Sequence, residues 1–292
     1  MGLYLESRLD FLVRTQNPDG GWGYFSGKSS WLEPTAYSML ALNGRPEAER
    51  AWKLVRGWQT ADGGFQPSGS VQGATWVTSL VITVASARGE YDPSIARAVA
   101  WLLNDTGNET RPMMRLYGWL GLLKTKADMT HDAWPWRPGT SSWIEPTAQA
   151  LVALKKVAGK YGTRELAGRV REGENQILSR RCSDGGWNCG NPNVLNIDLP
   201  SYPETTALAL LGLAGRSPSE LRAPLQVANH WLGETRSSLA KAWLTIALRN
   251  HGLPVPDPSE APSAGPDVML TAIEALGHSQ GNHRLLAAGK TA

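Results

Sequence analysis

The sequence has little of several features that would otherwise define its class. Its two cysteines, Cys182 and Cys189, could not hold 292 residues together as a disulfide, and we predict two reduced, buried thiols. Charged residues make up only 19%, the net charge is +3 and no basic run occurs, so we expect no nucleic-acid partner. No segment of about 18 apolar residues is present, which excludes a membrane-spanning helix. The N-terminus lacks a signal-peptide pattern, and a cytoplasmic location is predicted.

Tryptophan and glycine, by contrast, are abundant: the chain has 13 Trp against three Phe, and 31 Gly. These residues recur in order. Residues 22–36 return as residues 134–148, at an offset of 112 residues without a gap. Both segments share two Trp, one Gly, two Ser and the run Glu-Pro-Thr-Ala. Such recurrence indicates internal repeats.

Each unit of the repeat has the same parts. Amphipathic segments come first, at 3–16, 48–59 and 164–181. Turns of the form Asp-Gly-Gly-aromatic follow, at 19–22, 62–65 and 184–187. After a polar loop come more uniformly apolar segments, at 35–43, 76–87 and 205–214. Amphipathic helices suit an outer ring that faces solvent, and apolar helices suit a buried inner ring.

This pattern predicts an all-α fold, an α/α toroid of five to six helical hairpins with eleven or twelve helices. We expect residues 1–292 to form a single domain. Residues 106–130 are predicted to be an insertion with an extra helix at 111–124, and the proline-rich residues 254–266 an extended tie. In the turns, we expect glycine to adopt positive φ, aspartate to cap nearby amides and tryptophan to cover helix ends.

The turn units beginning at Gln16 and Gln59, together with Asp-Gly-Gly-Trp at 184–187, resemble the QW repeat of squalene–hopene and oxidosqualene cyclases. The same repeat, more loosely, marks protein prenyltransferase β-subunits. This resemblance covers roughly residues 3–276 and implies membership of the terpenoid cyclase/protein prenyltransferase superfamily, here with a single barrel. It implies an α/α barrel around an apolar, aromatic-lined cavity for an isoprenoid, and acid-initiated carbocation chemistry.

Acidic residues lie near the start of several apolar segments: Glu33, Glu145, Glu204 and Asp267. In the cyclases, one such helix begins Asp-x-Asp-Asp-Thr-Ala, and its middle aspartate protonates an alkene or an epoxide. Matching the Thr-Ala step puts Glu33 and Glu145 at that place, but the flanking acids are missing. A helix-starting role is the alternative, because a carboxylate is stabilised near a helix N-terminus and proline is a favoured first residue.

Aromatic residues that could stabilise a cation or bind the substrate lie at or within the inner segments: Trp31, Trp76, Trp143, Tyr202 and Trp243. A second candidate cluster contains His131 and Asp132, which could provide a general base or part of a metal site, or only cap a helix. The zinc ligands of prenyltransferases and an Asp-rich magnesium site are both missing, so we expect no cofactor and no metal.

Three functions remain open at this point. The first is a small terpenoid cyclase-like enzyme that acts on an isoprenoid, with Glu145 or Glu204 as the acid. The second is a non-catalytic barrel that binds an isoprenoid or a partner protein. The third is a polysaccharide-acting toroid enzyme with paired acids. An apolar small molecule is the expected partner, and peripheral contact with a membrane is compatible with the sequence.

Overall fold

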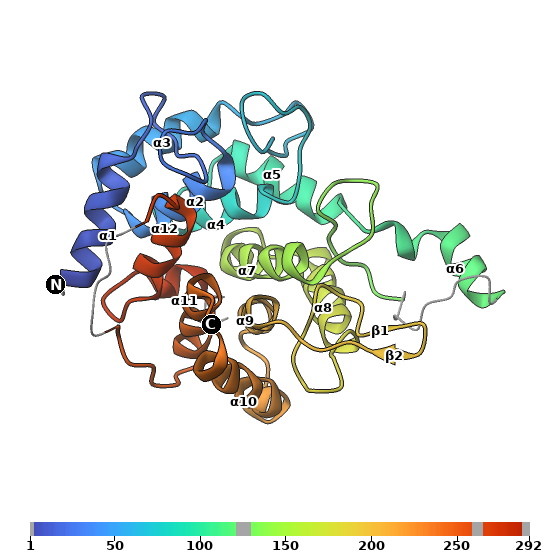
Figure 1. The fold of residues 1–292 in the computed structure, drawn as a ribbon. Coiled ribbons are helices and arrows are strands. Elements are labelled where there is room, and N and C mark those ends of the chain that lie inside the picture. The colour runs from blue at the N-terminus through green and yellow to red at the C-terminus, as the bar shows by residue number, and fades with distance from the viewer. Residues whose placement is uncertain (1–2, 121–129, 259–264, 288–292) are drawn as a thin grey trace.

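The computed structural model describes residues 3–120, 130–258 and 265–287, and these segments form an α/α toroid (Figure 1). Twelve α-helices occur in the described segments, which agrees with the eleven or twelve expected. The inner ring consists of α2 (Leu32–Ala41), α4 (Thr78–Arg88), α7 (Ile144–Tyr161), α9 (Pro203–Gly212), α11 (Ser238–Asn250) and α12 (Val268–Gly277). Each inner helix packs against the next, and α12 packs against α2, so the ring is closed.

Amphipathic helices form the outer ring, as their polar faces predicted. They are α1 (Leu3–Arg14), α3 (Pro46–Arg56), α5 (Pro93–Asn104), α8 (Arg164–Ser179) and α10 (Pro218–Glu234). Helix α1 packs on α12, and α10 packs on both α9 and α11. Extended chain, rather than a helix, occupies the described part of the proline-rich tie, at 253–258; residues 259–264 lie outside the described segments.

The aromatic turns join the two rings by the same bonds in each unit. The indole N–H of Trp22 donates to the Leu12 carbonyl at 2.8 Å, and its backbone N–H donates to the Thr35 hydroxyl at 2.9 Å. Phe65, Trp134 and Trp187 make the same backbone bond to Thr78, Thr147 and Thr206. Gly20, Gly63 and Gly185 adopt positive φ, as predicted for these turns.

Neighbouring units are linked by a repeated backbone hydrogen bond at or just before the start of four inner helices, α2, α4, α7 and α12. The acceptor is the carbonyl two residues after a turn aromatic. The pairs, donor first, are Val268–Tyr24 at 2.9 Å, Leu32–Pro67 at 2.8 Å, Trp76–Trp136 at 3.3 Å and Ile144–Cys189 at 3.1 Å. The first of these pairs joins the last unit to the first, so the ring closes by the bond that joins units within it.

Two segments, the insertion and a small hairpin, lie outside the two rings of helices. The insertion carries a short 3-10 helix, η1 (Asn108–Thr110), and α6 (Pro112–Trp119), which confirms the first part of the expected extra helix. Its remainder, 121–129, lies outside the described residues. A small hairpin of β1 (Asn193–Val194) and β2 (Ile197–Asp198) follows α8 and was not predicted from the sequence. Figure 1 shows α6 and the hairpin projecting from the ring.

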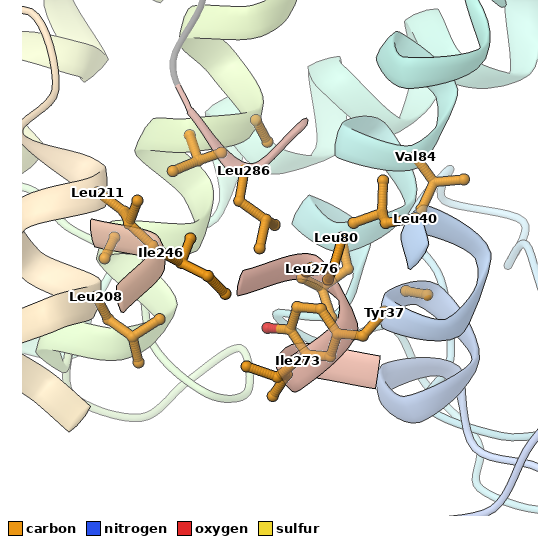
Figure 2. Close-up of a cluster of buried hydrophobic side chains, with 14 of the residues drawn as sticks. Tyr37, Leu40, Leu80, Val84, Leu208, Leu211, Ile246, Ile273, Leu276 and Leu286 are labelled. Atoms are coloured by element: carbon orange, nitrogen blue, oxygen red, sulfur yellow. The ribbon is translucent and has the colours of Figure 1, made fainter. Parts of the chain in front are cut away.

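The middle of the barrel is filled by side chains. Figure 2 shows Leu40, Leu80, Leu208, Ile246 and Leu276 around the axis, each at most 3% exposed. The second 3-10 helix, η2 (His283–Leu286), contacts α11 and α4 and places Leu286 among these side chains. None of the described helices is both long and apolar enough to cross a bilayer.

Candidate functional site

The N-terminal ends of the inner helices bring three glutamates to one end of the barrel. Glu33, Glu145 and Glu204 are each the second residue of an inner helix: α2, α7 and α9. The negative charges of Glu33 and Glu204 both act on Glu145. Carboxyls that lie far apart in the sequence therefore share one site, which the repeat alone did not reveal.

Glu145 has a strongly shifted pKa. Burial of its carboxyl and, after it, the negative charges of Glu33 and Glu204 raise the pKa of Glu145 from 4.5 to about 8. Burial raises this pKa because a charged carboxylate loses its hydration, and neighbouring negative charges penalise it further. Glu145 is therefore mostly protonated at neutral pH and has a proton to donate.

Glu33 has a different environment. The Tyr24 hydroxyl donates a hydrogen bond of 2.5 Å to its carboxylate. Burial raises the pKa of Glu33, and this hydrogen bond acts in the opposite direction by stabilising the charged form. Glu204 instead accepts a hydrogen bond from the Ser237 hydroxyl at 3.2 Å. Equivalent glutamates thus have unlike partners.

The helix-starting alternative stays open, because all three glutamates lie in the first turn of their helices. The residues before α2, α7 and α9 are Trp31, Trp143 and Tyr202, and none of them makes a side-chain cap hydrogen bond. Asp267 was expected to match the glutamates, but it is the N-cap residue of α12, and its carboxylate accepts from the Leu270 N–H at 2.8 Å. It therefore corresponds to Trp31 rather than to Glu33.

Aromatic side chains surround the glutamates at this end, which we call the acidic mouth. Trp143 and Tyr202 are 39% and 45% exposed, whereas Trp31 and Trp76 are half-buried. Trp76 packs edge-on against Trp136 with ring centroids 5.0 Å apart. The aromatic residues thus lie at the mouth, and the middle of the barrel is mainly aliphatic, in contrast to the aromatic-lined interior that the resemblance implies.

A buried polar pair lies at the mouth. The Gln149 amide donates to the Tyr37 hydroxyl at 2.9 Å, and the Tyr37 ring packs edge-on against Trp243 at 5.4 Å. The negative charges of Glu33 and Glu145 act on Tyr37. Trp243, which was predicted to bind substrate, is 3% exposed.

The second candidate cluster lies elsewhere. His131 contacts Glu172 of the outer helix α8 at 3.1 Å, and the Asp132 backbone carbonyl accepts from Arg169 of the same helix at 2.9 Å. His131 and Asp132 thus contact an outer helix, whereas the three glutamates lie at the N-terminal ends of the inner helices α2, α7 and α9.

Metal binding has no support from the described segments. Within residues 3–120, 130–258 and 265–287, no three His, Cys, Asp or Glu side chains are grouped as metal ligands. Both cysteines are free; Cys182 is buried as expected, but Cys189 is exposed, contrary to the prediction, because it lies in the loop beside the mouth.

Four residues of the mouth were not predicted from the sequence: Tyr24, Tyr37, Trp136 and Gln149. A signal was present, because the offset of 112 residues that relates the two repeat copies also relates Tyr24 to Trp136 and Tyr37 to Gln149. In a ring, equivalent positions face a common axis. If the offset of 112 residues is also applied to positions at which the two copies differ, it identifies these four residues.

Comparisons with known proteins support the fold. No family model matches the sequence, and no curated protein matches it either. Among solved structures, type II terpene cyclase MstE from Scytonema aligns with a TM-score of 0.56 at 16% identity, over 94% of this chain and 76% of that one. A GH8 endo-β-1,4-glucanase from an Achatina fulica gut metagenomic library aligns with a TM-score of 0.60 at 13% identity, over 93% and 96%. A protein from Actinoplanes aligns at 0.57 and 18%, over 93% and 78%. At these identities, the three structures show that the chain shares their fold, and they do not show its function.

Proposed function

We propose that this chain is a small terpenoid cyclase-like enzyme in which Glu145 donates a proton to an isoprenoid bound at the acidic mouth. The observation that carries the proposal is the enclosed carboxyl of Glu145 beside Glu33 and Glu204, with its pKa raised to about 8. Protonation of an alkene or an epoxide needs a carboxylic acid that stays neutral until it acts. The neighbouring acids that the local sequence lacks are supplied by other units of the ring.

The reaction balances with one proton. The O–H bond of Glu145 breaks, and its proton forms a new C–H bond at an alkene or a new O–H bond at an epoxide. The resulting carbocation is attacked by further double bonds of the substrate, and the final cation loses a proton to a base. The negative charges of Glu33 and Glu204 and the faces of Trp76 and Trp143 favour the cation.

Glycoside hydrolysis is the second candidate. It is favoured by the paired carboxyls, because an acid with a raised pKa and a second, ionised carboxylate are what this reaction requires. The exposed rings of Trp143 and Tyr202 would serve as stacking surfaces for sugars. In this mechanism, Glu145 protonates the glycosidic oxygen and Glu33 activates a water molecule.

Product analysis with matched variants tests the proposal. The purified protein is incubated with farnesyl and geranylgeranyl diphosphate, squalene and oxidosqualene, and the organic extract is analysed by GC–MS. A parallel reducing-sugar assay uses neutral and uronate glycans. We expect a cyclic product that falls at least about 100-fold in Glu145→Gln. Glu165→Gln, an exposed acid on α8, is the control and should keep full activity.

The other outcomes overturn the proposal in distinct ways. New reducing ends that depend on Glu145 would establish the glycosidase instead. A co-purified isoprenoid that remains unchanged in the wild type would indicate a binding protein without catalysis. A cyclic product that persists in Glu145→Gln would remove Glu145 from the role of acid.

A further inference from the structure

We propose that Tyr24 is a positioning residue that fixes the roles of the paired carboxyls: its hydroxyl holds Glu33 as the ionised partner and leaves Glu145 as the acid. This inference deepens the proposed function and rests on it for the roles of the two acids. Its structural basis is the 2.5 Å hydrogen bond from Tyr24 to Glu33. The equivalent position beside Glu145 is Trp136, which has no hydroxyl to form such a bond.

Tyr24 is held in place by the link that closes the ring. Its carbonyl accepts from the Val268 N–H at 2.9 Å, and the Ser26 N–H donates to the Pro266 carbonyl at 2.9 Å. The segment around Tyr24 is thus fastened to the chain before α12 on both sides of Phe25. These bonds fix the backbone from which the Tyr24 side chain reaches Glu33, so the first and last units of the ring together build the site.

Because of the groups that face Glu33, the Tyr24 hydroxyl has a large effect on the ionisation of Glu33. On the same helix, Tyr37 has a raised pKa and remains a neutral phenol. Glu145 on α7 and Glu204 on α9 add negative charge to the mouth. Among these groups, Tyr24 donates a hydrogen bond to Glu33 and thereby stabilises its charged form. Because two close carboxyls do not both ionise readily, stabilising the charge on Glu33 keeps the proton on Glu145.

The test measures the two carboxyls directly. Glutamate labelled with ¹³C at the side-chain carboxyl is incorporated into the full chain, and Glu33→Gln and Glu145→Gln assign the two signals. In the wild type, Glu33 should ionise at lower pH than Glu145. In Tyr24→Phe, we expect the interval between the two transitions to narrow by about one pH unit, since a hydrogen bond to a charged group contributes about that much.

Two further variants make the result specific. Tyr91→Phe removes a phenol from the outer ring and should leave both titrations unchanged. Val268→Pro removes the N–H that donates to Tyr24, at the first residue of α12, where proline is tolerated. We expect Val268→Pro to narrow the interval between the Glu33 and Glu145 titrations by less than Tyr24→Phe does. If Tyr24→Phe does not fold, Val268→Pro still tests the inference.

The inference is overturned if a folded Tyr24→Phe protein titrates like the wild type. It is also overturned if Glu145 ionises before Glu33 in the wild type. These outcomes are separate from the failure of the proposed function. If Glu145→Gln retains product formation while Tyr24→Phe narrows the interval, Glu145 is not the catalytic acid, but the effect of Tyr24 on the ionisation of Glu33 stands.

Discussion

The two copies of the repeat at 22–36 and 134–148 share a scaffold but give their glutamates different environments. In both copies, the loop closes with an equivalent backbone bond, from Lys28 to Phe25 at 3.1 Å and from Thr140 to Arg137 at 3.2 Å. In the first copy, the residue after the glycine is Tyr24, whose hydroxyl reaches Glu33. In the second copy, the equivalent position has no hydroxyl, because it is Trp136.

This difference shows how one fold element can give the same residue two environments. In the proposed function, the glutamate of one copy is the acid and the equivalent glutamate of the other copy is its partner. Environment rather than residue type separates them, as in enzymes that use paired carboxyls. The following predictions first substitute residues that the two copies have in common, and then residues that differ between them.

The largest effect is expected where the copies are alike. Trp22→Ala and Trp134→Ala each remove a side chain that is at most 1% exposed, together with its indole hydrogen bond. Each should lower the free energy of unfolding by about 4 kcal/mol, and the two values should agree within about 1 kcal/mol. Urea denaturation followed by circular dichroism measures both. A tolerated substitution in one copy would show that the scaffolds are not equivalent.

The next prediction concerns the dependence of stability on pH. Because the pKa of Glu145 is raised from 4.5 to about 8, the folded protein binds a proton that the unfolded chain releases in this range. Stability should therefore fall as pH rises from 5 to 8. Glu145→Gln removes this dependence and should be more stable than the wild type by about 2 kcal/mol at pH 8, with little difference near pH 4.

Thermal denaturation at a series of pH values measures this difference. Glu33→Gln should show a smaller gain, because Tyr24 offsets part of the burial effect on Glu33. Glu165→Gln, on the outer surface, should follow the wild type. An equal gain in Glu33→Gln and Glu145→Gln would contradict the distinction between the two copies.

A third prediction tests the contact between the copies. Gln149→Leu removes the donor of the buried hydrogen bond to Tyr37, and the phenol is left without this partner. We expect a loss of about 1.5 kcal/mol, because a buried polar group without a partner is costly. The double variant Tyr37→Phe with Gln149→Leu should recover most of it. Failure to recover would mean that Gln149 acts through packing alone.

The smallest expected effect comes from making the copies more alike. Trp136→Tyr introduces a phenol at the position that corresponds to Tyr24. We expect it to lower the pKa of Glu145 by about one unit through a new hydrogen bond. Carboxyl titration by ¹³C NMR provides the readout. A pKa that stays at its wild-type value would show that the two loops aim their side chains differently.

The toroid was predictable because its signals are local. The Asp-Gly-Gly-aromatic turns, the amphipathic segments and the apolar segments each specify their own geometry, and the ring follows from repetition. Glu33, Glu145 and Glu204 were found for the same reason, since they stand at a fixed place in the unit. The raised pKa of Glu145 was not predictable, because it depends on the burial of its carboxyl and on the charges of Glu33 and Glu204 from other units.

Other contacts could not be read from the sequence. His131 and Asp132 contact Glu172 and Arg169 of the outer helix α8, and their catalytic role stays a prediction. Tyr24 was overlooked because its importance comes from Glu33, nine residues later, and from Val268 at the other end of the chain. Contacts across a closed ring are not visible in a linear pattern. A cytoplasmic location, a single domain over residues 1–292 and an isoprenoid partner stay predictions.

The most direct test of the central claim is the pH titration of Glu145 and Glu33 in the wild-type protein by ¹³C NMR of their carboxyl groups. The account predicts that Glu145 titrates with a pKa of about 8, above that of Glu33. A protonated acid would then be available at neutral pH beside an ionised partner. A Glu145 signal that titrates near 4.5, or below Glu33, would contradict the assignment of Glu145 as the acid.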